Sequence, residues 1–405
     1  MDSGNTAWIL VSAALVLFMV PGLALFYGGM SRSKNMLNML MMNMVCLGIV
    51  PIFWYVMGYS LSSTGTDNGW IGTFDNLFLS GINITGEDGG AGLRDVFFAL
   101  TFASITPALI SGAVADRLKF SAWLVFVPLW MLLVFTPSWA WVFKAEGSGW
   151  LAQRGSLDFA GGTVVHVAAG AASLAFVFAL GKRKGWPNEA MLPHNLPFTV
   201  LGAGILWFGW FGFNAGSAFA ADGVAIQAFA NTFIAGAAAM MSWLAVEKLV
   251  DGHATSLGAA SGIVAGLVGI TPGAGFMGVN GALGVGLVAG ALCALAVRLK
   301  FRFGYDDALD VVGVHLVGGL VGGILIGLFA SPASLGGDFE AGLIEGGGAG
   351  LLFEQIFANV VVGVFSFVVT FALVKALDAT IGLRVSDDDE RAGLDSTQHA
   401  ETAYN

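Results

Sequence analysis

Charged residues are scarce in this sequence. Aspartate, glutamate, lysine and arginine make up 11% of its 405 residues, whereas a soluble protein carries about 25%. Hydrophobic residues make up 56%, and they fall in continuous runs of roughly 20 residues, the length of a helix that spans a bilayer. The scarcity of charge argues against a soluble fold, and the continuous runs argue against the alternating pattern of a membrane β-barrel. We predict an all-α polytopic membrane protein.

Cysteine is also scarce, and a basic leader is missing. The two cysteines, Cys46 and Cys293, both lie in apolar runs, which favours neither a disulfide framework nor a metal site. The residues before the first run include Asp2 but no lysine or arginine, so we expect that run to remain as a spanning helix and not to be cleaved. The sequence shows no basic surface of the kind that would bind nucleic acid. No nucleophile–base pattern or cofactor-binding loop indicates an enzyme, and we expect no cofactor.

What the sequence does contain is eleven apolar spans. They lie at about 7–29, 36–60, 95–115, 121–143, 159–180, 198–217, 225–247, 256–272, 281–297, 311–330 and 349–377. An odd number of spans places the two termini on opposite sides of the membrane. Of the 17 lysines and arginines, all except Arg94, Lys144 and Arg154 fall in one set of alternate loops and in the tail. The positive-inside rule therefore predicts a cytoplasmic C-terminus and an outside N-terminus in the cell (inner) membrane.

The spans divide into two halves of five. Repeat one covers about 7–180 and repeat two about 198–330, and an odd number of spans per half means that the second is inverted. The eleventh helix, at about 349–377, stands outside the repeats as a brace. We expect a transmembrane domain over residues 1–377 and a cytoplasmic regulatory tail over 378–405.

Two histidines mark matching positions in these halves. Val-His-Val-Ala-Ala-Gly surrounds His166, and Val-His-Leu-Val-Gly-Gly surrounds His315, each in the fifth span of its half. Ionisable groups inside spans are costly and are functional candidates. Burial disfavours the imidazolium ion, so a neutral pair would offer one free N–H and one free nitrogen to a small solute. Helix-to-helix bonding is the structural alternative, and a zinc site lacks its third and fourth ligands.

Asp158 and Asp310 precede the two histidines. We expect both carboxylates to support the fold by capping free N–H groups at a helix start. Asp158 stands eight residues before His166, about 12 Å along a helix, which is too far for a direct bond. The working pair is therefore predicted to be His166 with His315, and Asp158 supports the mouth of the helix and would bias it toward cations.

Several segments resemble the ammonium transporter family (Amt/Mep/Rh), specifically its Amt branch. The similarity runs from Phe-Tyr-Gly-Gly at 26–29 to the tail, and it rests on Asp-Phe-Ala-Gly-Gly-Thr-Val-Val-His (158–166), Trp-Phe-Gly-Phe-Asn-Ala-Gly-Ser (210–217), Asp-Val-Val-Gly-Val-His (310–315) and Gly-Leu-Arg-Val (382–385). These motifs are long and ordered, so the resemblance is specific.

The resemblance implies a homotrimer in which each subunit has its own pore. It assigns the pore lining to His166 and His315, conduction to Asp158, and an outer gate to Phe102 and Phe213. An outer recruitment site for ammonium would use Trp210 and Ser217 with a third ring, and aromatic rings do attract cations. Here that third ring is either Trp141 or Phe143, and the nearby charges of Lys144 and Arg154 would weaken binding.

The expected function is ammonium transport. Ammonia, with or without a separately moving proton, would pass the twin histidines, and methylammonium would serve as an analogue. The tail resembles a segment that docks neighbouring subunits and that often works with a cytoplasmic PII-type signalling protein. Two alternatives stay open: an ammonium sensor that acts through a cytoplasmic partner, and a Rh-like neutral gas channel.

Overall fold

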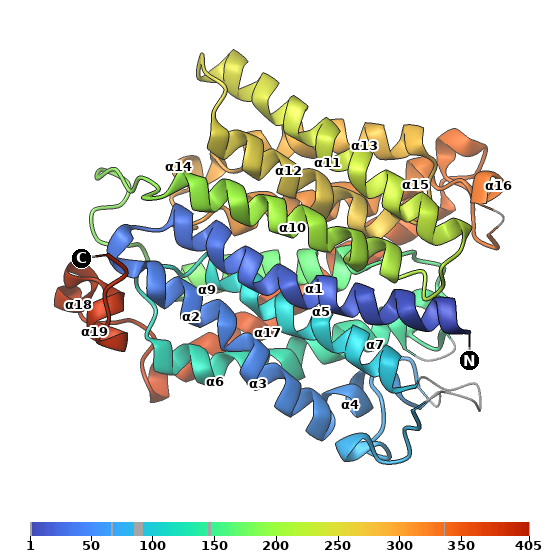
Figure 1. The fold of residues 1–405 in the computed structure, drawn as a ribbon, viewed down its shortest axis with the longest axis horizontal. Helices are drawn as coiled ribbons and strands as arrows, with labels where there is room; N and C mark the ends of the chain where they lie inside the picture. Colours follow the sequence, from blue (N-terminus) through green and yellow to red (C-terminus); the bar gives the residue numbers. More distant parts are fainter. Residues whose placement is uncertain (1, 66–67, 85–91, 145–146, 336, 405) are drawn as a thin grey trace.

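The computed structural model describes residues 2–65, 68–84, 92–144, 147–335 and 337–404. It is a bundle of long helices that run side by side, with the two termini at opposite ends (Figure 1). We call these ends the N-terminal face and the tail face. Within the described residues, eleven helical runs are long and apolar enough to cross a membrane. The prediction of an all-α, eleven-span membrane protein is confirmed.

The helix bounds follow the predicted spans closely. The first five spans consist of α1 (Ser3–Met30); η1 (Ser33–Asn35), α2 (Met36–Met44), α3 (Cys46–Phe53), η2 (Trp54–Gly58) and α4 (Tyr59–Ser63); α5 (Leu93–Ser111); α6 (Phe120–Trp130), η4 (Met131–Phe135) and α7 (Thr136–Phe143); and η6 (Gly162–Val167) with α9 (Ala168–Leu180). The other six consist of α10 (Leu196–Gly216); α11 (Gly223–Val250); α12 (Ser256–Ile270) with η7 (Thr271–Gly273); α13 (Val279–Ala296) with α14 (Leu299–Phe303); η8 (Val312–Leu316) with α15 (Val317–Phe329); and α17 (Gly350–Thr380). Shorter helices outside the spans are η3 (Leu77–Leu79), α8 (Trp150–Gln153), α16 (Pro332–Leu335), η9 (Leu343–Glu345), α18 (Asp387–Ala392) and α19 (Leu394–His399).

The third, fifth, eighth and tenth spans are the shortest of the described runs, at 18 or 19 residues. A membrane helix needs about 20 residues to cross the hydrocarbon, so the ends of these spans continue into non-helical backbone. Such backbone is tolerated at membrane depth only where protein surrounds it. The longer spans of the bundle provide that surrounding.

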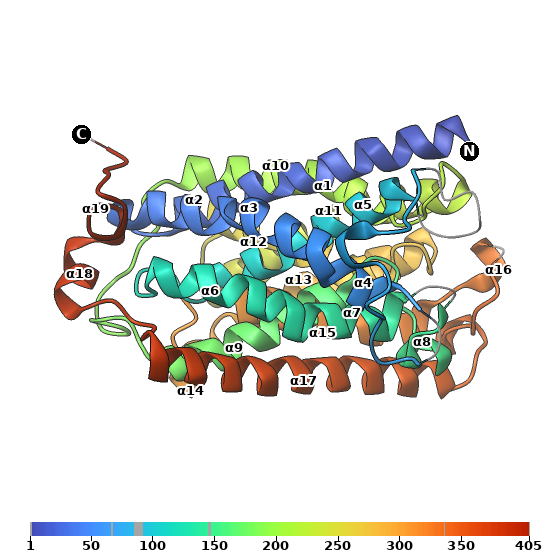
Figure 2. The same cartoon turned by 90° about the horizontal axis from the view of Figure 1, so that it is seen from below.

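The two halves are joined through their first spans. A Cβ atom on Gly202 of α10 would lie 2.4 Å from the backbone nitrogen of Phe26 of α1, and one on Gly29 would lie 2.5 Å from the carbonyl oxygen of Asn195. Small residues allow this close approach between membrane helices. Figure 2 shows α1 and α10 together on the side of the bundle opposite α17.

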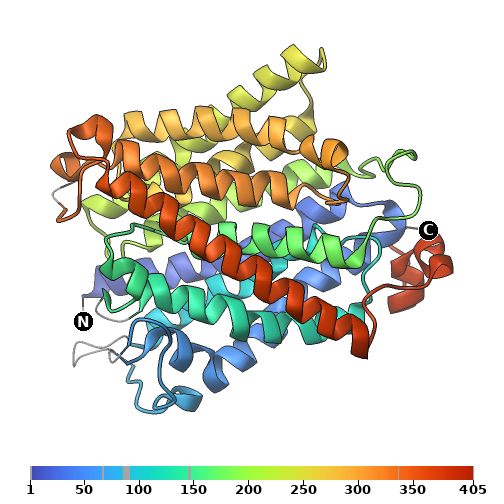
Figure 3. The same cartoon turned by 180° about the vertical axis from the view of Figure 1, so that it is seen from behind.

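The last span lies across the others as the predicted brace (Figure 3). Its buried polar side chains face the bundle. Ser366 Oγ donates to the carbonyl of Ala168 at 2.7 Å, and Thr370 Oγ1 accepts from Trp130 Nε1 at 2.8 Å. Hydrogen bonds between helices are one of the forces that hold membrane bundles together.

A buried charge network lies at the tail face. Arg183 pairs with Asp306 at 2.8 Å and with Asp116 at 3.4 Å, and Arg117 donates to the backbone carbonyl of Asp306 at 2.6 Å. Burial opposes ionisation of Asp306, but Arg183 and Arg117 together hold the pKa of this carboxyl below its ordinary value. Buried charges persist only when they are paired in this way.

The tail folds back onto this face instead of extending away from it. The carboxylate of Asp395 accepts from the backbone N–H groups of Leu37 and Asn38 at 3.0 and 2.8 Å, at the start of α2. The Tyr404 hydroxyl lies 2.9 Å from His194 Nε2, in the loop before α10. The end of the chain is thereby anchored to the start of α2 and to the loop before α10.

The Asp395 contact predicts how firmly the tail is held. A side-chain cap contributes about 1 kcal/mol, so Asp395→Ala should raise hydrogen exchange of residues 394–404 about fivefold. Mass spectrometry of exchanged peptides measures this change. Asp388→Ala, at an exposed position of α18, is the matched control and should leave exchange unchanged. Equal exchange in the two variants would mean that Asp395 does not anchor the tail.

Candidate functional site

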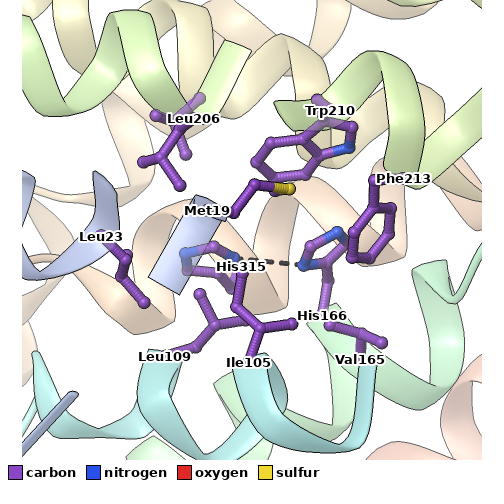
Figure 4. A pocket seen from close by; sticks show the side chains of 11 residues that line it. Met19, Leu23, Ile105, Leu109, Val165, His166, Leu206, Trp210, Phe213 and His315 are labelled. Carbon is purple, nitrogen blue, oxygen red and sulfur yellow. Dashed lines mark hydrogen bonds between the residues drawn. The ribbon is translucent and has the colours of Figure 1, made fainter. Parts of the chain in front are cut away.

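His166 and His315 meet inside the bundle, as the sequence predicted. Their Nδ1 atoms lie 3.3 Å apart, and the ring centroids are 5.3 Å apart (Figure 4). The exposed fractions of the two residues are 1% and 3%. His166 lies in η6 and His315 in η8, so each half of the chain contributes one ring.

Both histidines stand in π-helical turns, His166 in η6 and His315 in η8. A π-helical turn is wider than an α-helical turn and is found mostly at functional sites. Since the turn adds a residue to the helix circumference, it rotates the side chains that follow relative to a regular helix. The same local device therefore orients the histidine in each half.

A carboxylate caps the start of each of these helices. Asp158 accepts from the backbone N–H groups of Gly161, Gly162 and Thr163, each at 2.8 Å. In the second half the cap is Asp307, which accepts from the N–H groups of Val311 and Val312 at 3.1 and 2.8 Å. These bonds satisfy donors that a helix start would otherwise leave unpaired. Burial raises the pKa of Asp158, and burial together with the nearby Asp310 raises that of Asp307 to about 6.

Asp310 is thus not the cap that the sequence analysis expected. Its carboxylate bonds Lys300 Nζ at 2.6 Å, and its backbone is left-handed, with φ of 66°. It holds the place of Gly161, where φ is 100°, because each residue lies three positions after its cap. One signal was available in the sequence: Asp307 precedes His315 by eight residues, the same spacing as Asp158 and His166.

The loops before the two histidine helices cross to the opposite half. Phe159, next to Asp158, donates its N–H to the carbonyl of Pro272 at 2.9 Å. Ala308, next to Asp307, donates its N–H to the carbonyl of Ala113 at 3.3 Å. Each fifth span is therefore tied to the end of the third span of the other half. These paired contacts support the interpretation of two inverted repeats.

The histidine pair lines a narrow, apolar cavity of about 10 Å³, close to the space needed for one water molecule. Apart from the two imidazoles its walls are hydrophobic (Figure 4): Met19, Leu23, Ile105, Leu109, Val165, Leu206, Trp210, Phe213 and Val264. Among the described residues, His166 Nε2 has no hydrogen-bond partner. The cavity therefore offers one small molecule imidazole nitrogens and little else that is polar.

Aromatic rings continue from the histidines toward the N-terminal face. Phe213 stacks on His166 at 6.0 Å, and Phe102 packs against Phe213 at 4.2 Å. Phe102 and Phe213, the two residues that the resemblance assigned to an outer gate, are both buried and in contact.

Trp210 lies deeper than the recruitment role requires. Its ring stacks on His166 at 5.4 Å, and its Nε1 donates to Thr271 Oγ1 at 2.8 Å. It is part of the cavity wall beside the histidine. Ser217 is half-buried one turn beyond Phe213, to whose carbonyl its hydroxyl donates at 2.8 Å.

Of the two candidates for the third ring, Trp141 points toward α17 and not toward Phe102 and Phe213. Its ring packs 4.5 Å from Phe365 on α17, and its Nε1 donates to the carbonyl of Trp70 at 2.9 Å. Phe143 instead packs 4.9 Å from Trp139, which lies 6.0 Å from Phe102. Trp139 was not singled out from the sequence. Its spacing of four from Phe143 places the two rings on one face of α7.

The positive charges beside this ring series are already engaged. Lys144 is buried and donates to the backbone carbonyls of Asn68 and Ile71. Arg154 forms a two-point ion pair with Glu354 at 2.8 and 2.9 Å. The ion pair of Arg154 weakens the expectation that this residue repels a cation at the mouth.

The fold and site together define a class of protein. Within the described residues, eleven long apolar helices surround a narrow, apolar cavity that two imidazoles line, an arrangement typical of a membrane transport protein. Comparison with known proteins gives the particular family. Residues 7–404 match the sequence profile of the Ammonium Transporter Family, and the chain belongs to that family.

Named relatives agree with this assignment over most of their length. An ammonium transporter of Mycobacterium tuberculosis (strain H37Rv) is 51% identical, covering 100% of this chain and 90% of the relative. One from Aquifex aeolicus is 47% identical, covering 100% and 94%. The crystal structure of Candida albicans Mep2 superposes with a TM-score of 0.89 at 32% identity, covering 96% of this chain and 88% of Mep2. A solved sensor Amt protein superposes with a TM-score of 0.90 at 27% identity, covering 98% of both chains.

The assignment of the second cap leads to a direct test. Asp307→Ala leaves two buried N–H groups unpaired, at about 1 to 3 kcal/mol each, so it should lower the melting temperature of the detergent-solubilised protein by several degrees. Asp310→Gly copies Gly161, and it relieves a positive φ while losing an ion pair worth about 0 to 1 kcal/mol. Its melting temperature should stay close to the parent. If Asp310→Gly lowered the melting temperature more than Asp307→Ala does, Asp310 would be the cap.

Proposed function

We propose that this ammonium transporter moves its substrate past His166 and His315 as neutral ammonia. The observation that carries the proposal is the pair of buried imidazoles, 3.3 Å apart, in an apolar cavity of about 10 Å³. A dehydrated monovalent cation pays a large penalty in such a cavity. Ammonium can release a proton before it crosses, whereas potassium cannot, so the same cavity discriminates between two ions of similar size.

The two imidazoles replace the hydrogen bonds that ammonia loses when it leaves water. A neutral imidazole has one donor and one acceptor nitrogen, and the unpartnered His166 Nε2 is available to a passing molecule. The proton either stays behind or follows along the histidine pair. Asp158 contributes by holding the turn that presents His166, through its three backbone bonds.

Ammonium is gathered at the N-terminal face before it loses its proton. We assign this recruitment to Ser217 and to Phe143, which joins the ring series through Trp139. Aromatic faces attract cations, and the buried rings Phe102 and Phe213 then exclude water from the path. Trp210 belongs to the conduit wall, and Trp141 to the packing beneath α17.

The excess of lysine and arginine on the tail side supports a cytoplasmic tail and an N-terminus outside the cell membrane. We propose a homotrimer with one conduit in each subunit, and a regulatory tail that answers to a cytoplasmic PII-type protein. The likeness to a sensor Amt protein makes ammonium sensing the second candidate function. Transport measurements separate the two, because a sensor would conduct little.

The histidine assignment is tested by the double variant His166→Ala, His315→Ala. Removal of both imidazoles should abolish ammonia uptake into proteoliposomes after an ammonium pulse, and with it any current recorded on a supported membrane, because ammonia loses its hydrogen-bonding partners. A potassium pulse reports selectivity, and His253→Ala, at an exposed loop position, is the matched control. An unchanged ammonium current in the double variant would sink the proposed route. Ammonia uptake without current in the parent protein would favour the neutral gas channel.

The recruitment assignment is tested by substituting each of the two candidate rings separately. Cation–π attraction is worth about 0.5 to 2 kcal/mol, so Phe143→Leu should raise KM for methylammonium uptake by about two- to thirtyfold. Trp141→Phe keeps the packing against α17 and should leave KM as it is. A raised KM in Trp141→Phe alone would return the role to Trp141.

A further inference from the structure

Gln355 lies in α17, outside both halves, and its side-chain amide is fully engaged. The backbone N–H of Leu157 donates to Gln355 Oε1 at 2.6 Å, and Gln355 Nε2 donates back to the carbonyl of Leu157 at 2.8 Å. Gln355 Nε2 also donates to the carbonyl of Gly323 at 3.0 Å. Only 1% of the residue is exposed, so these three bonds form where water does not compete.

These bonds join the two spans that carry the histidines. Leu157 immediately precedes Asp158, the cap of the His166 helix, and Gly323 lies in α15, eight residues after His315. A side chain that binds both the N–H and the carbonyl of one residue fixes the orientation of that backbone as well as its position. Gln355 thus sets where the first capping carboxylate stands relative to the second histidine span.

The packing around Gln355 leaves little freedom for these elements to slip. A Cβ atom on Gly323 would lie 2.4 Å from Asn359 Nδ2, one turn along α17 from Gln355. The backbone of α15 therefore rests directly on α17 at this level. Asn359 Nδ2 in turn donates to the carbonyl of Gln355 at 2.7 Å, which holds this turn of α17 in place.

We propose that Gln355 is a positioning residue for conduction: it holds Leu157 and Asp158 against α15 so that His166 and His315 keep their register. This inference rests on the proposed conduction route. Gln355 acts through Leu157 and Asp158 on one side and through Gly323 on the other. Loss of its amide should slow passage through the conduit while leaving recruitment at the outer mouth unaffected.

Gln355→Met tests the proposal, because methionine has a similar length and no hydrogen-bonding amide. A small displacement of reacting groups lowers rates by up to about a hundredfold, so we expect the maximal rate of methylammonium uptake to fall at least about tenfold. KM should change less than about twofold, since the recruitment rings are untouched. Thr370→Val is the matched control. It removes a buried hydrogen bond between α17 and Trp130 and leaves the hydrogen bonds of Gln355 in place, so it should retain the parent rate.

Gln355→Glu supplies a titratable rescue in the same protein. A protonated glutamic acid accepts from the Leu157 N–H and donates to one carbonyl, whereas its carboxylate faces the carbonyls of Leu157 and Gly323 with no proton to share. The neighbouring charges are Asp158 and the Arg154–Glu354 pair. The uptake rate of this variant, divided by that of the parent at each pH, should be highest at low pH and should fall as the pH rises.

The outcomes separate the inference from the function on which it rests. A reduced rate in Gln355→Met with a parent-like KM, together with rescue of Gln355→Glu at low pH, supports the proposal. Parent-like rates in both variants would refute it, and so would an equal loss in Thr370→Val. If the double histidine variant conducts normally, the route itself fails. If that variant is inactive but Gln355→Met is not, only the positioning role fails.

Discussion

The structure depends on two carboxylates that satisfy backbone donors inside a membrane protein. Asp158 and Asp307 accept from the N–H groups that open the helices of His166 and His315. An unpaired backbone donor costs several kcal/mol at membrane depth, so a short span that begins in non-helical chain needs such a cap. With the caps in place, both helices can begin inside the bundle, and both can start with a π-helical turn that directs a histidine inward.

On the proposed route, selectivity between ammonium and potassium comes from a cavity that offers no charge to compensate a cation. The carboxylates of Asp158 and Asp307 accept hydrogen bonds from backbone N–H groups. Apart from the two imidazoles, the walls of the cavity are hydrocarbon and aromatic rings. A cation that entered would meet two imidazoles and no free carboxylate among the cavity-lining residues. The carboxylates near the histidines thus stabilise the helix starts, and the proposed conduit itself has no charged side chain among its lining residues. The crossed bonds of Phe159 and Ala308 and the amide of Gln355 then keep the two halves in register.

The sequence predicted the position of each residue along its span well, but it predicted poorly which way a side chain points around the helix axis. Spans of apolar residues gave eleven helices, and matched motifs placed His166 opposite His315 and Phe102 beside Phe213. The position of a side chain around a helix was harder, because a π-helical turn breaks the 3.6-residue period on which such an inference depends. Trp141 follows the π-helical turn η4 and faces α17. Trp210, which the resemblance assigned to the recruitment site, lies in the regular helix α10 and stacks on His166. Asp310 was expected to be a cap because it lies at the start of the tenth span, whereas the spacing shared with the first half identifies Asp307.

The two faces of the bundle hold the histidine helices by different chemistry. At the N-terminal face the neutral amide of Gln355 fixes the chain beside Asp158. At the tail face Arg117 donates to the carbonyls of Gly181, after α9, and of Asp306, next to the second cap. The backbone carbonyl of Arg117 also accepts from Val385 of the tail at 3.1 Å. One residue is therefore shared by the end of the first histidine helix, the start of the second and the tail. A displaced tail would leave the carbonyl of the buried Arg117 without this partner, at the residue that anchors both helices, whereas the Gln355 contacts at the other face do not involve the tail.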